Sequence, residues 1–185
     1  MTRIVFLDRD GTLNREVGFV RATDRLELLP GVVDAVRRLD ASGRRVVIVT
    51  NQSGIARGLY TETDLARIHE ELHRRLLGIP LAYLHCPHHP EGGHGYGGAC
   101  RCRKPGNGLL HQARELLGVS FDGGALVGDS ARDLTMARGL PLTTVHVASG
   151  KPAAIELAAM AHDGFAPDHC AADLAAAVDW LLARR

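Results

Sequence analysis

Short apolar runs alternate with longer segments of helical periodicity along most of the chain. Five apolar runs, several of them rich in Val and Ile, predict buried strands at residues 4–7, 46–49, 81–84, 125–127 and 144–148. Apolar positions spaced three and four residues apart predict helices at 32–40, 62–77, 108–117, 131–138, 153–161 and 172–183. This alternation is typical of a doubly wound α/β fold, in which helices cover both faces of a parallel sheet. Without an internal repeat or a linker, one domain over residues 1–185 is expected.

The predicted helix at 62–77 has the clearest boundary signal. Thr61 precedes it as a candidate N-cap, with Asp64 three residues later, and the spacing is that of a capping box. The apolar residues Leu65, Ile68, Leu72 and Leu76 share one face. His69 and His73 are four residues apart on the same helix, next to glutamates, and we expect both at the surface.

Polar and acidic side chains follow three of the predicted strands. Asp8 and Asp10 come after the first, Thr50-Asn51-Gln52-Ser53-Gly54 after the second, and Gly128-Asp129-Ser130 after the run at 125–127. A single loop aspartate is most often a turn former or a helix cap. In open α/β sheets, however, the carboxyl ends of the strands form the ligand site. Three carboxylates at that edge would repel one another without a cation, and oxygen ligands favour a hard ion such as Mg²⁺.

Residues 85–107 interrupt the alternation of strands and helices. This segment reads HCPHHPEGGHGYGGACRCRKPGN and shows no usable periodicity, so it needs its own source of order. A closed Cys₃His zinc site could be formed by two pairs of residues, Cys86 with His88 and Cys100 with Cys102. Binding of zinc would offset the entropy that the glycine-rich segment loses when it becomes ordered. His85, His89 and His94 are alternatives to His88, which is preferred because Pro87 fixes the chain between it and Cys86. Four protein ligands leave no place for water, so the predicted zinc is structural.

A basic pair directly follows the predicted zinc ligands. Arg103 can form a bidentate contact with a phosphate, and Lys104 can supply the cation that the strand ends lack. A zinc-folded turn would aim both side chains from a loop without other support. Lys151 follows the last predicted strand and is expected to lie outside the site.

Three motifs, in order along the chain, resemble the haloacid-dehalogenase superfamily of aspartate-nucleophile phosphatases: DRDGT at 8–12, TNQSG at 50–54 and GDSARD at 128–133. The resemblance implies that Asp8 attacks phosphorus, and that Asp10 protonates the leaving oxygen and later activates water. It also implies that Mg²⁺ is held by the Asp8 carboxylate, the Asp10 main-chain carbonyl and Asp129. Thr50, Asn51 and a lysine would neutralise the phosphoryl oxygens.

Further stretches are similar to one branch of this superfamily, the heptose-bisphosphate phosphatases, with the histidinol-phosphate phosphatases as the near alternative. These stretches are GFV at 18–20, CPHHPE at 86–91, CRCRKP at 100–105 and SGKP at 149–152. The resemblance implies no large cap domain, with a zinc loop at about 85–105 and the 14–21 loop partly covering the site. It implies that zinc is held by Cys86, His88, Cys100 and Cys102. It also implies substrate contacts at ten positions: Glu16, Val17, Gly18, Phe19, Thr50, Asn51, Gln52, Ser53, Arg103 and Lys104. Ser130 stands where this branch often has lysine after the second metal-binding aspartate.

Composition excludes several function classes. Among 185 residues, 45% are apolar and the formal net charge is +1, so nucleic-acid or acidic-membrane binding is not expected. No apolar run approaches the ~20 residues of a membrane span, and the N-terminus lacks a signal-peptide pattern. We therefore expect a cytoplasmic, monomeric, Mg²⁺-dependent phosphatase of a small phosphorylated sugar. A non-catalytic, zinc-stabilised binding module is the alternative from another class, and the presence of both Asp8 and Asp10 argues against it.

Overall fold

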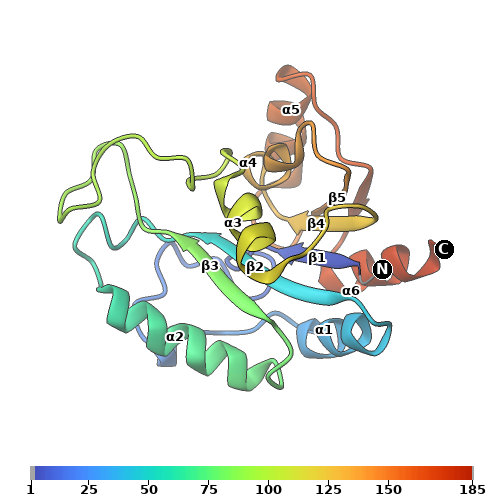
Figure 1. The fold of residues 1–185 in the computed structure, drawn as a ribbon, viewed down its shortest axis with the longest axis horizontal. Helices are drawn as coiled ribbons and strands as arrows, with labels where there is room; N and C mark the ends of the chain where they lie inside the picture. The colour runs from blue at the N-terminus through green and yellow to red at the C-terminus, as the bar shows by residue number, and fades with distance from the viewer. Residues whose placement is uncertain (1–2, 185) are drawn as a thin grey trace.

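Six parallel strands form one sheet through the middle of the structure (Figure 1). The computed structural model describes residues 3–184, in which the strands are β1 (Ile4–Leu7), β2 (Arg45–Asn51), β3 (Ala82–Cys86), β4 (Gly124–Gly128), β5 (Leu142–Val147) and β6 (His169–Ala171). Their spatial order is β3-β2-β1-β4-β5-β6, so the chain builds outward from β1 first on one side and then on the other. The predicted doubly wound fold is confirmed.

Helices cover both faces of the sheet. They are α1 (Val32–Ala41), α2 (Glu62–Arg75), α3 (Gly108–Leu117), α4 (Ala131–Leu134), α5 (Ala153–His162) and α6 (Leu174–Ala183), with short 3₁₀ turns at Thr23–Arg25 and Thr135–Ala137. Figure 1 shows α1, α2 and α6 on one face and α3, α4 and α5 on the other. Within residues 3–184, no helix combines the length and the apolar character that a bilayer crossing requires.

Alternate residues of the central strands enter two different apolar cores. In β1, Val5 and Leu7 pack against the α1, α2 and α6 face, whereas Ile4 and Phe6 pack against the α3 and α5 face. All four are at most 1% exposed. Because both faces are buried, the strand is apolar throughout, and its first polar residue falls where the strand ends. The sheet therefore places Asp8 at its edge.

Most predicted elements match the structure, with two differences. Strand β6 was not predicted, because a three-residue edge strand that begins with His169 has no apolar run. The predicted helix at 131–138 is only one turn of α-helix, α4, followed by the 3₁₀ turn at Thr135–Ala137. The capping box of α2 is present: Asp64 N donates to Thr61 Oγ1 at 3.1 Å, and Thr61 N donates to Asp64 Oδ2 at 3.0 Å.

The expectation that His69 lies at the surface is wrong. Its side chain packs between α2 and the edge strand β3, with ring centroids 5.1 Å from Tyr83 and 5.9 Å from His85. His69 is 8% exposed, and its Nε2 has no hydrogen-bond partner among the described residues. Burial lowers the pKa of His69 to about 2, and the charges of Arg9 and His85 add to this effect.

This burial predicts a pH dependence of stability. Below pH 6.5 the unfolded chain protonates His69, whereas the native state keeps it neutral, so the unfolded state binds more protons and stability falls as pH decreases. At pH 5 the contribution of this one residue reaches about 2 kcal/mol. His69→Phe should flatten the decrease in the free energy of unfolding between pH 7 and pH 5, measured by urea titration. His162→Gln, at a histidine that is 89% exposed, should leave it unchanged. An unaltered slope in His69→Phe would contradict this account.

Candidate active site

The carboxyl ends of β1 and β4 lie side by side at the middle of the sheet. The order of the strands reverses at this point, and Asp8 and Asp129 are the first residues after β1 and β4. Thr50 and Asn51 end β2 on the other side of β1. Doubly wound sheets bind ligands in the crevice at such a reversal point, and these four side chains are placed there by topology alone.

Three buried aspartates form a compact cluster in this crevice. Carboxylate oxygens of Asp8, Asp129 and Asp133 all lie within 4.8 Å of one another. Asp133 comes from α4 and closes its capping box, with Oδ2 accepting from Ser130 N at 3.1 Å and from the Ser130 hydroxyl. The cluster therefore contains one aspartate, Asp133, that is not among the predicted ligands.

Lys104 is the cation that joins two of these aspartates. Its Nζ donates to Asp8 Oδ1 at 2.6 Å and to Asp133 Oδ1 at 2.8 Å, and the residue is 2% exposed. Burial alone would lower the pKa of Lys104, but the two carboxylates outweigh burial and raise it. Burial would likewise raise the pKa of Asp133, but the charge and hydrogen bond of Lys104 lower it overall. Lys104 is thus a buried ammonium with a carboxylate on each side.

Asp8 and Asp129 remain short of positive charge. Burial, then the charge of Asp133, raises the pKa of Asp8 well above its usual value, even though Lys104 opposes this. Burial and Asp133 also raise the pKa of Asp129 to about 7. Buried carboxylates with raised pKa values bind a hard divalent cation favourably, because the cation supplies the missing charge and takes oxygen ligands. Asp8 and Asp129 fit the predicted Mg²⁺ site, whereas the role of the Asp10 carbonyl stays a prediction.

Gly11 allows the chain to pass close to Asp129. A Cβ atom at this position would lie 2.4 Å from Asp129 Oδ2, and φ is +85°, in the left-handed region. Any larger residue would push against the carboxylate and strain the backbone. The glycine of the DRDGT motif is therefore required by the site itself.

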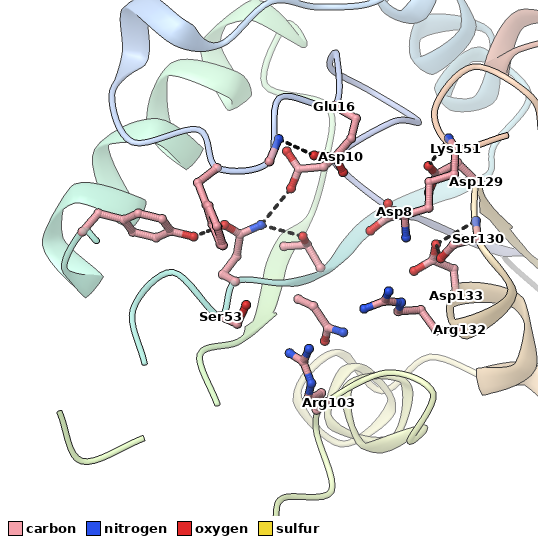
Figure 2. A pocket seen from close by; sticks show the side chains of 16 residues that line it. Asp8, Asp10, Glu16, Ser53, Arg103, Asp129, Ser130, Arg132, Asp133 and Lys151 are labelled. Atoms are coloured by element: carbon pink, nitrogen blue, oxygen red, sulfur yellow. Dashed lines mark hydrogen bonds between the residues drawn. The ribbon is translucent and has the colours of Figure 1, made fainter. Parts of the chain in front are cut away.

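Asp10 lies in the same cavity but outside the aspartate cluster, beside Glu16 (Figure 2). Its carboxylate accepts hydrogen bonds from Arg9 Nη2 at 2.8 Å, Asn14 Nδ2 at 2.9 Å and Gln52 Nε2 at 2.9 Å. Its side chain is 20% exposed, compared with 8% for that of Asp8. The two aspartates of the motif thus have different surroundings, one paired with a buried lysine and one held by three donors at the cavity wall.

Most of the predicted substrate contacts line one cavity of about 320 Å³. Glu16, Gly18, Phe19, Thr50, Asn51, Gln52, Ser53 and Arg103 surround it together with the aspartates. Lys104 lies beneath it, and Val17, 40% exposed, does not line it, so a substrate contact of Val17 stays a prediction. The expectation for Lys151 is wrong, because Lys151 lines the cavity and its N–H donates to Asp129 Oδ2 at 2.9 Å.

Besides Lys151, four residues at the cavity were not predicted as site residues: Tyr60, Ser130, Arg132 and Asp133. The S-x-x-D spacing of Ser130 and Asp133 is a capping-box signal, which pointed to a structural role rather than to a ligand. Tyr60 and Arg132 have no sequence signal of their own. They reach the cavity only because the loop after β2 and the first turn of α4 fold back over it.

The predicted zinc ligands form a second cluster in the segment after β3. Cys86, His88, Cys100 and Cys102 each offer one donor atom, and five of the separations between these atoms run from 2.9 to 3.8 Å. A tetrahedral site with Zn–S bonds of about 2.3 Å has edges of about 3.8 Å, so the donor set suits zinc, and the four donors would move slightly apart to hold it. Two of the competing histidines are engaged elsewhere: His85 Nε2 pairs with Glu62 Oε2 at 2.7 Å, and His89 Nε2 with Arg57 Nη2 at 2.9 Å.

This cluster is tied directly to the aspartate site. Arg103 Nη1 donates to the His88 carbonyl at 3.1 Å, and Lys104 N donates to Asn51 Oδ1 at 3.1 Å. Cys102 is the residue before this pair, so the backbone that carries Lys104 is held at the cysteine cluster on one side and at the end of β2 on the other. An ordered loop here sets the position of the buried ammonium.

Positive charge without a carboxylate partner gathers at the mouth of the cavity. Within residues 3–184, Arg103, Arg132 and Lys151 form no ion pair closer than 4.0 Å. Burial and the charge of Arg132 both lower the pKa of Arg103. Figure 2 shows Arg103 and Arg132 facing the same space. Like charges that face a cavity without a partner favour an anionic ligand.

Comparisons with known proteins agree with this geometry. The Hydrolase_like family, described as HAD-hyrolase-like, matches residues 101–177. The chain is 40% identical over 156 residues to a D-glycero-beta-D-manno-heptose-1,7-bisphosphate 7-phosphatase of Pasteurella multocida (strain Pm70), covering 82% of this chain and 85% of that protein. It is 40% identical over 153 residues to the protein of the same name in Escherichia coli (strain K12), covering 80% of each.

A solved structure is similar over the whole chain. It is the D,D-heptose 1.7-bisphosphate phosphatase from B. bronchiseptica complexed with magnesium and phosphate, with a TM-score of 0.84 and 35% sequence identity over 100% of both chains. The D,D-heptose 1,7-bisphosphate phosphatase from Burkholderia thailandensis has a TM-score of 0.69 and 29% identity, covering 99% of this chain and 100% of that one.

The buried ion pairs of Lys104 generate a test of stability. Lys104→Met would leave Asp8 and Asp133 buried without their cation, and breaking such a pair costs about 3–5 kcal/mol. We expect the free energy of unfolding of Lys104→Met to be lower than that of the wild type by this amount, measured by urea titration at pH 7.5 without added divalent cation. The matched control is Lys151→Met, whose side chain forms no ion pair in the part of the chain that the structure describes; it should change stability by less than about 1 kcal/mol. Equal stability of the two variants would show that Lys104 does not hold the cluster together.

Proposed function

The chain belongs to the haloacid-dehalogenase-like hydrolases, in the branch of heptose-bisphosphate phosphatases, and from this we propose that it removes the 7-phosphate of D-glycero-D-manno-heptose 1,7-bisphosphate. We infer that the reaction proceeds through a phospho-Asp8 intermediate and requires Mg²⁺. The observation that carries the proposal is the Asp8 carboxylate at the base of the cavity, fixed by Lys104 and with Asp10 on the neighbouring wall.

The first step transfers the phosphoryl group to the enzyme. A carboxylate oxygen of Asp8 forms a bond to phosphorus while the bond from phosphorus to the sugar oxygen breaks, and Asp10 gives that oxygen its proton. Thr50, Asn51 and Lys104 surround the position of the phosphoryl oxygens and offset their charge. Asp8, Asp129 and the Asp10 carbonyl would hold Mg²⁺, which would supply the further positive charge that an anionic nucleophile needs to approach an anionic phosphate.

The second step returns the enzyme to its starting state. Asp10, now without its proton, accepts one from a water molecule, and the water oxygen attacks the phosphorus of phospho-Asp8. Inorganic phosphate leaves, and Asp8 is free again. The three donors around Asp10 keep it at the cavity wall during both steps, where one group can serve first as acid and then as base.

The charge at the cavity mouth favours a bisphosphate over histidinol phosphate. Arg103 and Arg132 line the same cavity, and the part of the substrate remote from Asp8 would rest against them. A second phosphate would pair with them, whereas the amino group of histidinol phosphate would add one more positive charge. Arg132 is well placed to provide part of the charge that Ser130 lacks at the position where this branch often has lysine.

The two substrates can be separated by measurement. We expect kcat/KM for D-glycero-D-manno-heptose 1,7-bisphosphate to exceed that for histidinol phosphate by at least about 100-fold, since the second substrate leaves the arginines unpaired. Asp8→Asn should abolish turnover of both and serves as the control for contaminating phosphatases. A preference for histidinol phosphate would overturn the assignment of substrate.

We also propose that Cys86, His88, Cys100 and Cys102 hold a structural zinc ion. Protein purified without added zinc should contain about one equivalent, and Cys100→Ser should lose it. Because the loop positions Lys104, we expect the variant to lose phosphatase activity as well, while the far-UV circular dichroism of the sheet and helices changes little. Metal content is measured by inductively coupled plasma mass spectrometry. Cys170→Ser, at an exposed cysteine far along the chain, is the control and should keep both zinc and activity. Less than half an equivalent in the wild type would contradict the zinc site.

A single domain over residues 1–185, a monomeric state and a cytoplasmic location stay predictions from the sequence.

A further inference from the structure

We propose that Tyr60 is a positioning residue of this phosphatase, and that it holds the acid–base group Asp10 in place through the side-chain amide of Gln52. The inference rests on the proposed function, because it assigns a role in the proton transfer of that reaction. Tyr60 lies nine residues beyond the end of β2 and is not a member of the aspartate cluster; its hydroxyl donates to Gln52.

Three short hydrogen bonds connect Tyr60 to the catalytic groups. The Tyr60 hydroxyl donates to Gln52 Oε1 at 2.7 Å. The Gln52 amide nitrogen then donates to Asp10 Oδ2 at 2.9 Å and to Thr50 Oγ1 at 2.8 Å. Gln52 is 2% exposed and Tyr60 7%, so water offers little competition for these bonds. One amide thus joins the proton donor to a phosphoryl-binding side chain.

Hydrogen-bonding chemistry allows only one orientation of this amide. The ionised Asp10 carboxylate only accepts hydrogen bonds, and when Asp10 carries the proton for the leaving oxygen that proton faces the substrate, so in both states the NH₂ group of Gln52 faces Asp10. The amide oxygen then points the other way, into a buried place where it needs a donor. The Tyr60 hydroxyl is that donor. Without it, Gln52 would keep a buried, unsatisfied oxygen, and the side chain would gain free energy by turning toward the cavity and water.

Tyr60 itself has little freedom to move. Its ring packs with Ile55 and Leu65 in a small apolar cluster, and Phe19 packs against the same cluster. A Cβ atom on Gly54 would lie 2.1 Å from the Tyr60 ring, so the ring rests directly on the backbone of the TNQSG loop. Burial raises the pKa of Tyr60 to about 12, and the hydroxyl therefore remains a donor throughout the working range of the enzyme.

The consequence concerns the geometry of proton transfer. Because Gln52 binds both Thr50 and Asp10, a phosphoryl group held at Thr50 meets its proton donor at a set distance. Arg9 and Asn14 also hold Asp10, so loss of the Tyr60 hydroxyl weakens one of three supports. We therefore expect a moderate loss of rate rather than inactivation, in the two steps in which Asp10 moves a proton. The value of kcat/KM reports the first of these, in which the leaving oxygen takes its proton.

The test compares two leaving groups in Tyr60→Phe. A sugar alkoxide must be protonated as it departs, whereas the nitrophenolate of 4-nitrophenyl phosphate leaves as a stable anion and needs no acid. The kcat/KM value covers the steps up to formation of phospho-Asp8. We expect Tyr60→Phe to lower kcat/KM for the heptose bisphosphate about tenfold and that for 4-nitrophenyl phosphate by less than twofold. Gln52→Met, which removes the amide and keeps the length of the side chain, should show the same selectivity.

Two controls separate positioning from a general structural effect. Tyr83→Phe removes the hydroxyl of a half-buried tyrosine, whose buried oxygen has no hydrogen-bond partner among residues 3–184, and should leave both rates unchanged. In the Asp10→Ala background, Tyr60→Phe should change kcat/KM for the heptose bisphosphate by less than twofold, since the group it positions is gone. Equal losses on both substrates, or no loss on either, would overturn the inference. A wild-type enzyme that hydrolyses 4-nitrophenyl phosphate but not the heptose bisphosphate would instead refute the proposed substrate.

Discussion

The pairing of buried Lys104 with Asp8 and Asp133 is the interaction on which the rest of the site depends. The parallel strands β1 and β4 end side by side and so bring Asp8 and Asp129 together, although the two carboxylates repel each other. Burial makes that repulsion stronger, because little water remains to screen it. One ammonium between two of the carboxylates lowers the cost enough for the cluster to exist, and the charge still missing at Asp129 is what a divalent cation would supply. The repulsion between the buried carboxylates therefore explains both the need for Lys104 and the affinity of the site for a divalent cation.

The same lysine explains why a loop of glycines, prolines and histidines belongs in the domain. Residues 85–107 cross the edge of the site without helix or strand after β3 ends, and apolar burial alone would not order them. Three cysteines and one histidine gather within bonding reach of one ion, and the chain continues directly into Arg103 and Lys104. A metal that takes no part in the chemistry would then affect it by setting the position of the buried Lys104 ammonium. The loop also brings Arg103 to the mouth of the cavity, so the same ordering contributes to substrate choice.

Local sequence patterns were enough to predict most strands and helices and some residues of the site. The apolar runs marked five strands because strands buried on both faces are apolar throughout, and Asp8 was found because it ends one of them. Residues whose roles depend on long-range packing could not be found in this way. Asp133 has the spacing of a helix cap and indeed caps α4, so its second role as a partner of Lys104 leaves no mark in the sequence. His69 was placed at the surface because its helix has a clear apolar face elsewhere, and only the register of α2 against Tyr83 buries it. Lys151 reaches the cavity because β5 ends beside β4, which is a property of strand order.

The central claim is that Asp8, rather than another member of the cluster, forms the bond to phosphorus. The most direct measurement is mass spectrometry of enzyme quenched in acid within milliseconds of mixing with substrate, followed by peptide mapping of the labelled carboxylate. We predict one phosphoryl group per chain, on the peptide that contains Asp8 and attached at Asp8, and none on Asp10, Asp129 or Asp133. A label on one of those residues, or a burst of product without any phosphorylated peptide, would contradict it.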